Sequence, residues 1–389
     1  MKKILFAIVM VSFTAISLFA APKKKTTPEL ELEPVIIDLP SIQGQEFFYS
    51  FDPRFEIVGL ICRLAEYPEC MRNYKGENKY LSQMDSFFEK YKDNPFIKQV
   101  RTQYKAKGIT PDDWVNLTFH IKPDFSGTVV PMDPLPRDLN PAWSKFKPKE
   151  LNDIVTKIHD FAKESNFARL AILNQGEYLN HLGRLNEEVE RFTIHTWGKD
   201  FFRNPEIDKV SLVCSYFWAG TNYSTCVTLP ENKRQFVVTE YPSSYYRNIA
   251  VEYGRLYAMQ YAKDNWDIVK DKYTVYEKNV MKKLHPEHEK EIEKKEYTYL
   301  DLASYVARFT MLDFLNYRGK NQTEKDIEDF GDYNQTYDSI CQSFEKEYGK
   351  TGTLGIELLK EYRNNPDKYP DFASFAPKIN DFINSLSVE

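Results

Sequence analysis

Residues 237–248 have the spacing of a catalytic metal helix but lack its metal ligands. In a zinc peptidase, H-E-x-x-H places two histidines on one helix face, where they bind the metal, and the glutamate activates a water molecule. Here the frame reads T-E-x-x-S, with Glu240 in the place of the general base. Thr239 and Ser243 occupy the two ligand positions, and hydroxyls are poor zinc ligands beside imidazole. Alone, this short pattern is common by chance, and both hydroxyls could simply cap a helix.

The residues around this motif predict a strand that leads into a helix. Residues 235–239 form an apolar, β-branched run, and Pro242 stands where the first helical turn tolerates proline. Side chains at spacings of three and four then fall on one helix face: Thr239, Ser243, Tyr246, Ala250 and Tyr253. The two hydroxyl positions would therefore lie where the buried stripe of the helix begins.

The motif and four other segments resemble a family of secreted bacterial proteins that look like zincins. In that family an apolar strand runs into H-E-F-x-H-S-F-x-N-P, which the chain matches in frame with Glu240-Tyr241, Ser244-Tyr245 and Asn248. The other resembling segments are residues 51–67 (D-P-R-x-E … R-L-A-x-x-P-E), 80–95 (Y … F-x-x-Y-K-x-x-P), 219–223 (G-x-N-Y-G) and 302–308 (E-x-x-x-R-A). The resemblance covers most of the mature chain.

The resemblance implies a zincin-like fold whose zinc site has lost its ligands. The acidic residue of the family's later helix would be the third ligand, and Ser304 stands in its place. Asn248 and Arg308 would lie beside the vacated positions. Glu240 would remain as a vestigial general base, without the metal-bound water whose pKa of about 7 makes hydrolysis possible. We therefore expect no cofactor, and zinc only if other residues bind it.

The amino-terminal residues predict export. Lys2 and Lys3 precede an uncharged apolar run at 4–19, and Ala20 and Ala21 offer a cleavage site. The run is shorter than the roughly 20 residues that a bilayer span needs. We expect a signal peptide over residues 1–20, a secreted or periplasmic product, and no integral membrane segment after cleavage. A retained anchor is the alternative.

Charge argues against nucleic acid as a partner. The chain has 52 Lys and Arg against 57 Asp and Glu, and its basic cluster at 23–25 adjoins the leader. Proteins that bind nucleic acid carry a basic surface to meet the phosphates. A peptide or an envelope protein is the partner class that we expect.

The remaining sequence predicts a helix-rich α+β fold with a small central sheet and flanking helices. Residues 21–44 are rich in Pro, Lys and Glu and are expected to form a disordered tether. One zincin-like domain would follow over 45–389, with a helical part at 45–205, the sheet and motif helix at 206–265, and a helical part at 266–389. Thr110 and Pro111 mark a helix start. Apolar spacing predicts further helices at 54–65, 80–92, 96–107, 148–164 and 167–191.

Two predicted strands, at 210–217 and 223–229, would form a hairpin across a Gly/Asn turn. Paired in this way, they would place Cys214 opposite Cys226 or one step away, close enough for a disulfide. A pair of buried thiols is the alternative.

His285 and His288 are the only close histidine pair in the sequence. Histidines three apart on a helix could bind a metal ion. The stretch 285–296 is mostly charged, however, which favours a solvated helix face.

Three hypotheses follow for the function. The first is a non-catalytic pseudo-metallopeptidase that binds a peptide or protein along a strand edge. The second is an active hydrolase that uses Glu240, either with another metal site or without a metal. The third is a structural envelope protein whose cleft is filled by its own side chains.

Overall fold

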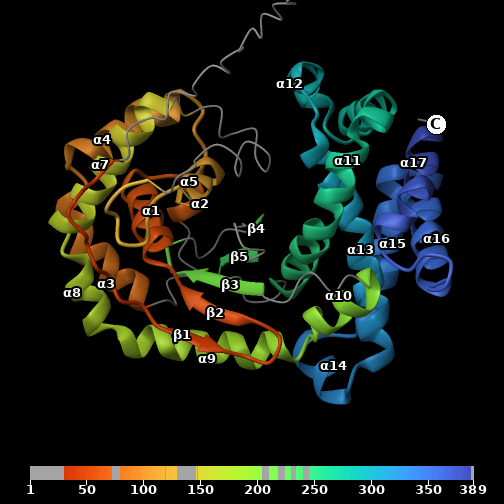
Figure 1. Ribbon diagram of the computed structural model, residues 1–389, viewed down its shortest axis with the longest axis horizontal. Coiled ribbons are helices and arrows are strands. Elements are labelled where there is room, and N and C mark those ends of the chain that lie inside the picture. Colours follow the sequence, from red (N-terminus) through yellow and green to blue (C-terminus); the bar gives the residue numbers. More distant parts are fainter. Residues whose placement is uncertain are drawn as a thin grey trace, which may run out of the picture.

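The computed structural model places a five-stranded sheet between two groups of helices (Figure 1). For the strands at 224–228 and 234–239, the structure describes the backbone but not the side chains. The described residues are 30–71, 79–118, 120–128, 146, 148–203, 210–217, 224–228, 234–239 and 245–386. The small sheet between two groups of helices confirms the predicted helix-rich α+β class.

The sheet has the strand order β1-β2-β3-β5-β4. Its strands are β1 (Ser41–Gln43), β2 (Phe48–Phe51), β3 (Val210–Ser215), β4 (Ser224–Thr228) and β5 (Arg234–Thr239). The inner strands β2, β3 and β5 are parallel to one another, and β1 and β4 run antiparallel to their neighbours. In the described part of the chain, β4 is therefore an edge strand.

The predicted hairpin between residues 210–217 and 223–229 is wrong. Both strands form near the predicted positions, but β5 lies between them. Cys214 pairs with Val238 on one side of β5, and Cys226 pairs with Phe236 on the other. Neighbouring strands are about 4.8 Å apart, so β3 and β4 are separated by about 10 Å, which is too far for a disulfide. Cys214 is a buried thiol.

The sequence of β5 explains why it displaces β4 from the place next to β3. Its run F-V-V is continuously apolar, as is typical of an inner parallel strand. The sequence of β4, S-T-C-V-T, is more polar and suits an edge. The turn signal between β3 and β4 was a local cue, and the pairing of β5 with both of these strands overrode it.

The helices before β3 lie on one side of the molecule in Figure 1, except for α10 (Ile194–Phe202), which lies beside α11 (Tyr245–Leu284) and α13 (Tyr299–Asn321) of the other group. The predicted helix over 167–191 is broken at Asn174, and the helix from Pro95 continues as a π-helical turn over Val100–Tyr104. The helices before β3 are α1 (Pro53–Leu64), α2 (Pro68–Met71), α3 (Lys79–Phe88), α4 (Pro95–Gln99), α5 (Pro111–Thr118), α7 (Pro148–Glu164), α8 (Phe167–Leu173), α9 (Gln175–Glu190) and α10 (Ile194–Phe202).

The helices after β5 form the other group. The longest, α11, has 40 residues and runs through residue 265, so the boundary expected there falls inside one continuous helix. The group consists of α11 (Tyr245–Leu284), α12 (Glu289–Lys294), α13 (Tyr299–Asn321), α14 (Glu324–Phe330), α15 (Tyr333–Tyr348), α16 (Lys350–Asn364) and α17 (Ala376–Asn384).

The expected tether over residues 21–44 is ordered from residue 30 onward. The Leu32 amide donates to the Ser126 carbonyl at 2.7 Å, and the Val35 amide donates to the Asp124 carbonyl at 2.8 Å. Ile37 is buried, and residues 41–43 form β1. The Pro, Lys and Glu content predicted disorder, but apolar residues spaced along the segment supply enough contact to hold it on the domain.

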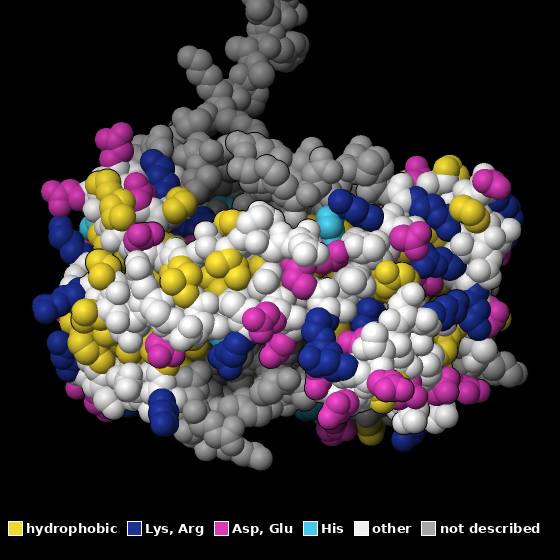
Figure 2. All heavy atoms as spheres, turned by 90° about the horizontal axis from the view of Figure 1, so that it is seen from below, with side chains coloured by type: hydrophobic (Ala, Val, Ile, Leu, Met, Phe, Trp, Pro, Cys, Tyr) yellow, Lys and Arg dark blue, Asp and Glu magenta, His cyan; other side chains and the backbone are white. Residues whose placement is uncertain are grey.

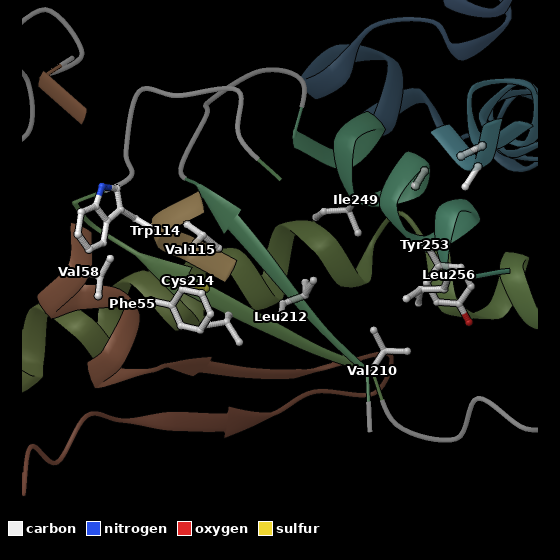
Figure 3. Close-up of a cluster of buried hydrophobic side chains, with 14 of the residues drawn as sticks. Phe55, Val58, Trp114, Val115, Val210, Leu212, Cys214, Ile249, Tyr253 and Leu256 are labelled. Atoms are coloured by element: carbon white, nitrogen blue, oxygen red, sulfur yellow. The ribbon is translucent and has the colours of Figure 1, made fainter. Parts of the chain in front are cut away.

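The sheet packs against helices from both groups (Figure 3). Phe55 and Val58 of α1 lie near the Cys214 end of β3, together with Trp114 of α5. Ile249 and Tyr253 of α11 lie towards the Val210 end. All of these side chains are buried, so β3 joins the two helical groups into one core.

Candidate functional site: the carboxyl edge of the sheet

The carboxyl ends of the three parallel strands meet at one edge of the sheet. Phe51 of β2 pairs with Cys214 of β3, and Ser215 of β3 pairs with Thr239 of β5. Ligands commonly bind at the carboxyl ends of parallel strands. We call the ends of these strands, with the first turns of α1, the carboxyl edge. The T-E-x-x-S motif begins at this edge, because Thr239 is the last residue of β5.

The D-P-R-x-E segment turns the chain from β2 into α1. Asp52 caps the helix, since its carboxylate accepts a hydrogen bond from the Arg54 amide at 2.9 Å, and Pro53 occupies the first helical position. The Arg54 guanidinium forms an ion pair with Asp52 at 2.5 Å and donates to the Ile121 carbonyl at 3.0 Å. Two residues of this segment therefore hold the start of α1 in place.

The third polar residue of the segment, Glu56, points into the core at the end of β3. Its carboxyl group is fully buried, and Oε1 accepts a hydrogen bond from the Tyr216 amide at 3.0 Å. The Tyr178 hydroxyl donates to Oε2 at 3.3 Å and accepts from the Tyr80 hydroxyl at 2.7 Å. Glu56 thus connects α1, α3, α9 and β3 through one chain of hydrogen bonds.

Aromatic rings enclose this chain of polar groups. Phe51 stacks on Tyr216 with ring centroids 5.3 Å apart and meets Tyr178 edge-on at 4.6 Å. Tyr80 lies 4.5 Å from Tyr216, and the His181 ring 4.9 Å from it. Since Tyr80 belongs to the second segment that resembles the family, two such segments meet here.

Burial raises the pKa of Glu56 to about 8. Hydrogen bonds from Ser215, the Tyr216 amide and Tyr178 act in the opposite direction, and the nearby Asp52 carboxylate adds to the rise. Glu56 is therefore a neutral acid at pH 7. Because it is fully buried, it has no route to a substrate and is suited to holding structure rather than to acting as a base.

The motif residues themselves are only partly described. Thr239 is placed by its backbone at the end of β5, and Asn248 lies in the first turn of α11. Glu240 and Ser243 lie outside the described residues. The role of Glu240 as a vestigial base therefore remains a prediction.

Ser304 and Arg308 both lie on α13, as the resemblance implied. The Ser304 hydroxyl donates to the Leu300 carbonyl one turn earlier, at 2.9 Å. Arg308 donates to the Tyr348 hydroxyl of α15 at 2.8 Å. Arg308 also acts on Glu277, whose pKa is raised by burial and lowered in part by this guanidinium. Both side chains thus have local partners on α13 and α15.

The packing of α13 on α11 places Ser304 relative to α11. Trp197 contacts Tyr253 near the start of α11 and Phe314 in the later part of α13. Farther along α11, Tyr273 contacts Tyr305. The two helices are therefore antiparallel, and Tyr305, next to Ser304, lies beside the later part of α11.

The rise of α11 gives the separation between the start of this helix and the place where it contacts α13. Gly254 contacts α13 at Ala307 and Thr310, and it lies about 14 Å along the helix from Tyr245. Ser304 precedes Ala307, so it lies still farther along α11 from Tyr245. Ser243 lies outside the described residues, and only the backbone of Thr239 is placed, so the convergence of Ser304 with these two positions remains a prediction.

Within the described residues, no group of three His, Cys, Asp or Glu side chains is arranged to hold a metal ion. The His285 and His288 side chains are 50% and 64% exposed, and each lies near Glu287. The prediction of a solvated face at this pair is confirmed.

No motif in the sequence marks Glu56 as a functional residue, but its place in the sequence is a signal. A glutamate stands inside the apolar run F-E-I-V-G-L-I, where a helix buries nearly every side chain. An acid inside such a run predicts a buried carboxyl group with dedicated partners. Its partner Tyr178, 122 residues away in the chain, could come only from the tertiary structure.

Comparisons with family models, curated proteins and solved structures find no match to this chain. In the part of the chain that the structure describes, every helix is too short or too polar to cross a bilayer.

Proposed function

We propose that this chain is an exported, zincin-like protein without a working zinc site, and that it binds an extended peptide segment along β4. The observation that supports this most directly is the position of β4. It is an antiparallel edge strand beside β5, and β5 leads straight to the motif. A peptide that added a strand to β4 would run past the carboxyl edge.

The chemistry of the edge favours binding over hydrolysis. The hydroxyls of Thr239 and Ser243 supply neither the charge nor the softness that hold zinc. Glu56 is sealed from solvent and protonated at neutral pH. Main-chain hydrogen bonds to β4 would give affinity without a reaction.

The face shown in Figure 2 does not favour a nucleic-acid ligand. On the face shown in Figure 2, acidic and basic side chains lie side by side, especially over the helices of the second group. A protein that binds phosphate backbones gathers positive charge on one face. The mixed charge suits a peptide or protein partner held by its main chain.

A library of fluorescent, unstructured decapeptides tests the proposal by fluorescence anisotropy. The best binder is then resynthesised with N-methyl groups at alternate residues, in both phases. If the peptide adds a strand to β4, one phase should abolish binding and the other should not, because alternate amides of an edge-paired strand face its partner.

Mass spectrometry of the bound peptide separates the alternatives. Cleavage that is lost on Glu240→Gln would support the hydrolase hypothesis and contradict a non-catalytic binder. If no peptide of the library binds, or if both methylated phases bind equally, the strand-addition proposal is wrong and the structural hypothesis gains.

A further inference from the structure

Glu56 is a buried acid and, in the part of the chain that the structure describes, no cation is bonded to it. Among the described residues, its hydrogen-bond partners are the Tyr216 amide and the hydroxyls of Tyr178 and Ser215. The charge that acts on it from α1 is Asp52, which has the same sign as an ionised Glu56. Arg54 of the same turn is bonded to Asp52. A carboxylate formed at this position would therefore lack an ionic partner.

The groups that face Glu56 from the other elements do not change this balance. Tyr80 of α3 and Tyr178 of α9 are phenols whose pKa values are raised by burial, so they stay neutral. Glu177 of α9 is acidic, and its carbonyl accepts from the Tyr216 hydroxyl at 3.0 Å. His181 of α9 packs against Phe51 and Tyr216 through its ring. None of these groups brings a fixed positive charge to the carboxyl group.

Glu56 is also connected to the strand that carries the motif. Its Oε1 holds the amide of Tyr216, the residue directly after β3. The preceding residue, Ser215, is the register partner of Thr239 at the end of β5. A shift of Tyr216 would therefore act on the last paired residues of both strands.

We propose that Glu56 is a proton switch for the carboxyl edge. With its proton, it holds the ends of β2 and β3 on α1 through Tyr216 and Tyr178. Without the proton, the donors of Tyr216 and Tyr178 still bond to the carboxylate, but the buried charge has lost its hydration. Opening the packed edge to water relieves this cost, and the ends of β3 and β5 then lose their fixed positions. The switch acts at the site of the proposed function. Only its effect on peptide binding rests on that proposed function.

The sign of the pH effect follows from the raised pKa. In the unfolded chain Glu56 releases its proton above a pH of about 4.5, while the folded protein keeps it until about 8. The folded state therefore binds more protons over this window, and its stability falls as pH rises from 4.5 to 8. One linked proton changes the unfolding equilibrium constant by about tenfold per pH unit.

Hydrogen exchange of the full mature chain, corrected for the chemical exchange rate at each pH, tests the switch between pH 6 and 9. In the wild-type protein, protection of residues 210–217 and 234–239 should fall by about tenfold or more between pH 7 and 9. Amides of α13 that exchange by local opening, which leaves Glu56 buried, should change less. Glu56→Gln keeps the shape without the charge, so its protection at the edge should not change with pH.

Glu33→Gln is the matched control. Glu33 is an exposed carboxylate paired with Lys163 at 2.8 Å, and it is ionised throughout this pH window. Its replacement should leave the wild-type pH profile at the edge intact. If Glu56→Gln does not fold, the wild-type profile still decides, because uniform protection at the edge from pH 7 to 9 overturns the switch.

Peptide affinity measured over the same pH range separates the two proposals. A peptide that binds wild type more weakly at pH 9 than at pH 7, but binds Glu56→Gln equally at both, supports the switch and its link to binding. If no peptide binds while the exchange profile behaves as expected, the proposed function fails and the switch stands. If the profile of Glu56→Gln matches that of wild type, the switch is wrong.

Discussion

Replacing Gly254 by alanine should destabilise the protein, although alanine is the better helix former. Gly254 lies on α11 against α13, and a Cβ atom there would be 2.1 Å from Thr310 Oγ1, 3.4 Å from Thr310 Cβ and 3.6 Å from the Ala307 carbonyl oxygen. Thr310 is fully buried, and its hydroxyl donates to the Ala307 carbonyl at 2.8 Å. Because a β-branched side chain in a helix has few rotamers, the hydroxyl cannot move aside easily.

Two opposing effects set the magnitude. Overpacking a buried contact costs about 1–3 kcal/mol. Replacing glycine by alanine within a helix gains about 1 kcal/mol. Since an approach of 2.1 Å is severe, the overpacking cost should lie at about 2–3 kcal/mol. The net loss in the free energy of unfolding should therefore be about 1–2 kcal/mol, measured by urea unfolding with the slope of the transition unchanged.

A double-mutant cycle shows whether the clash is the cause. Thr310→Ala removes the oxygen that a new Cβ would meet, and the next atom, at 3.4 Å, is in ordinary contact distance. Gly254→Ala should then be stabilising in the Thr310→Ala background, with a coupling energy of about 2 kcal/mol.

Gly183→Ala provides the matched control. Gly183 lies within α9, and nothing lies within 4 Å of the Cβ that would be added. This variant should gain about 0.5–1 kcal/mol. If Gly254→Ala gained as much as Gly183→Ala, the close approach of α11 and α13 at this position would be wrong.

Three further predictions concern a helix cap, the metal and acid stability. Thr110→Ala should lower the free energy of unfolding by about 1 kcal/mol in urea, since Thr110 caps α5. Mass spectrometry of the purified protein should find no stoichiometric zinc. Thr239→His, Ser243→His and Ser304→Glu together should confer zinc binding; a triple variant that binds zinc no more tightly than the two histidine substitutions alone would contradict Ser304 as a ligand position. Burial lowers the pKa of His120 to about 3, so the folded state resists protonation and loses stability as pH falls from about 6.5 to 3. His120→Gln should reduce this loss of stability, measured by urea unfolding at each pH. An unchanged dependence of stability on pH would contradict this prediction.

The sequence by itself determined the elements whose causes are local. The apolar spacing of residues 148–164 predicted α7 with the bounds that the structure gives. The threonine and proline at 110–111 marked the start of α5, and Thr110 Oγ1 accepts from the Asp113 amide at 3.4 Å. The charged stretch after residue 285 predicted an exposed histidine pair. Each depends on neighbours within one or two helical turns.

Only the tertiary structure decided how these elements meet. The sequence predicted the strands at 210–217, 223–229 and 235–239, but a local turn signal suggested the wrong pairing, because burial of β5 between two strands is a non-local gain. The spacing of residues around Glu240 was enough to indicate a motif in the sequence. Glu56, at the same edge of the sheet, owes its neutral acid form to burial, and its hydrogen-bond partners Tyr178 and Tyr216 are more than 100 residues away in the chain. A buried carboxyl group depends on its partners in space, which spacing in sequence cannot specify.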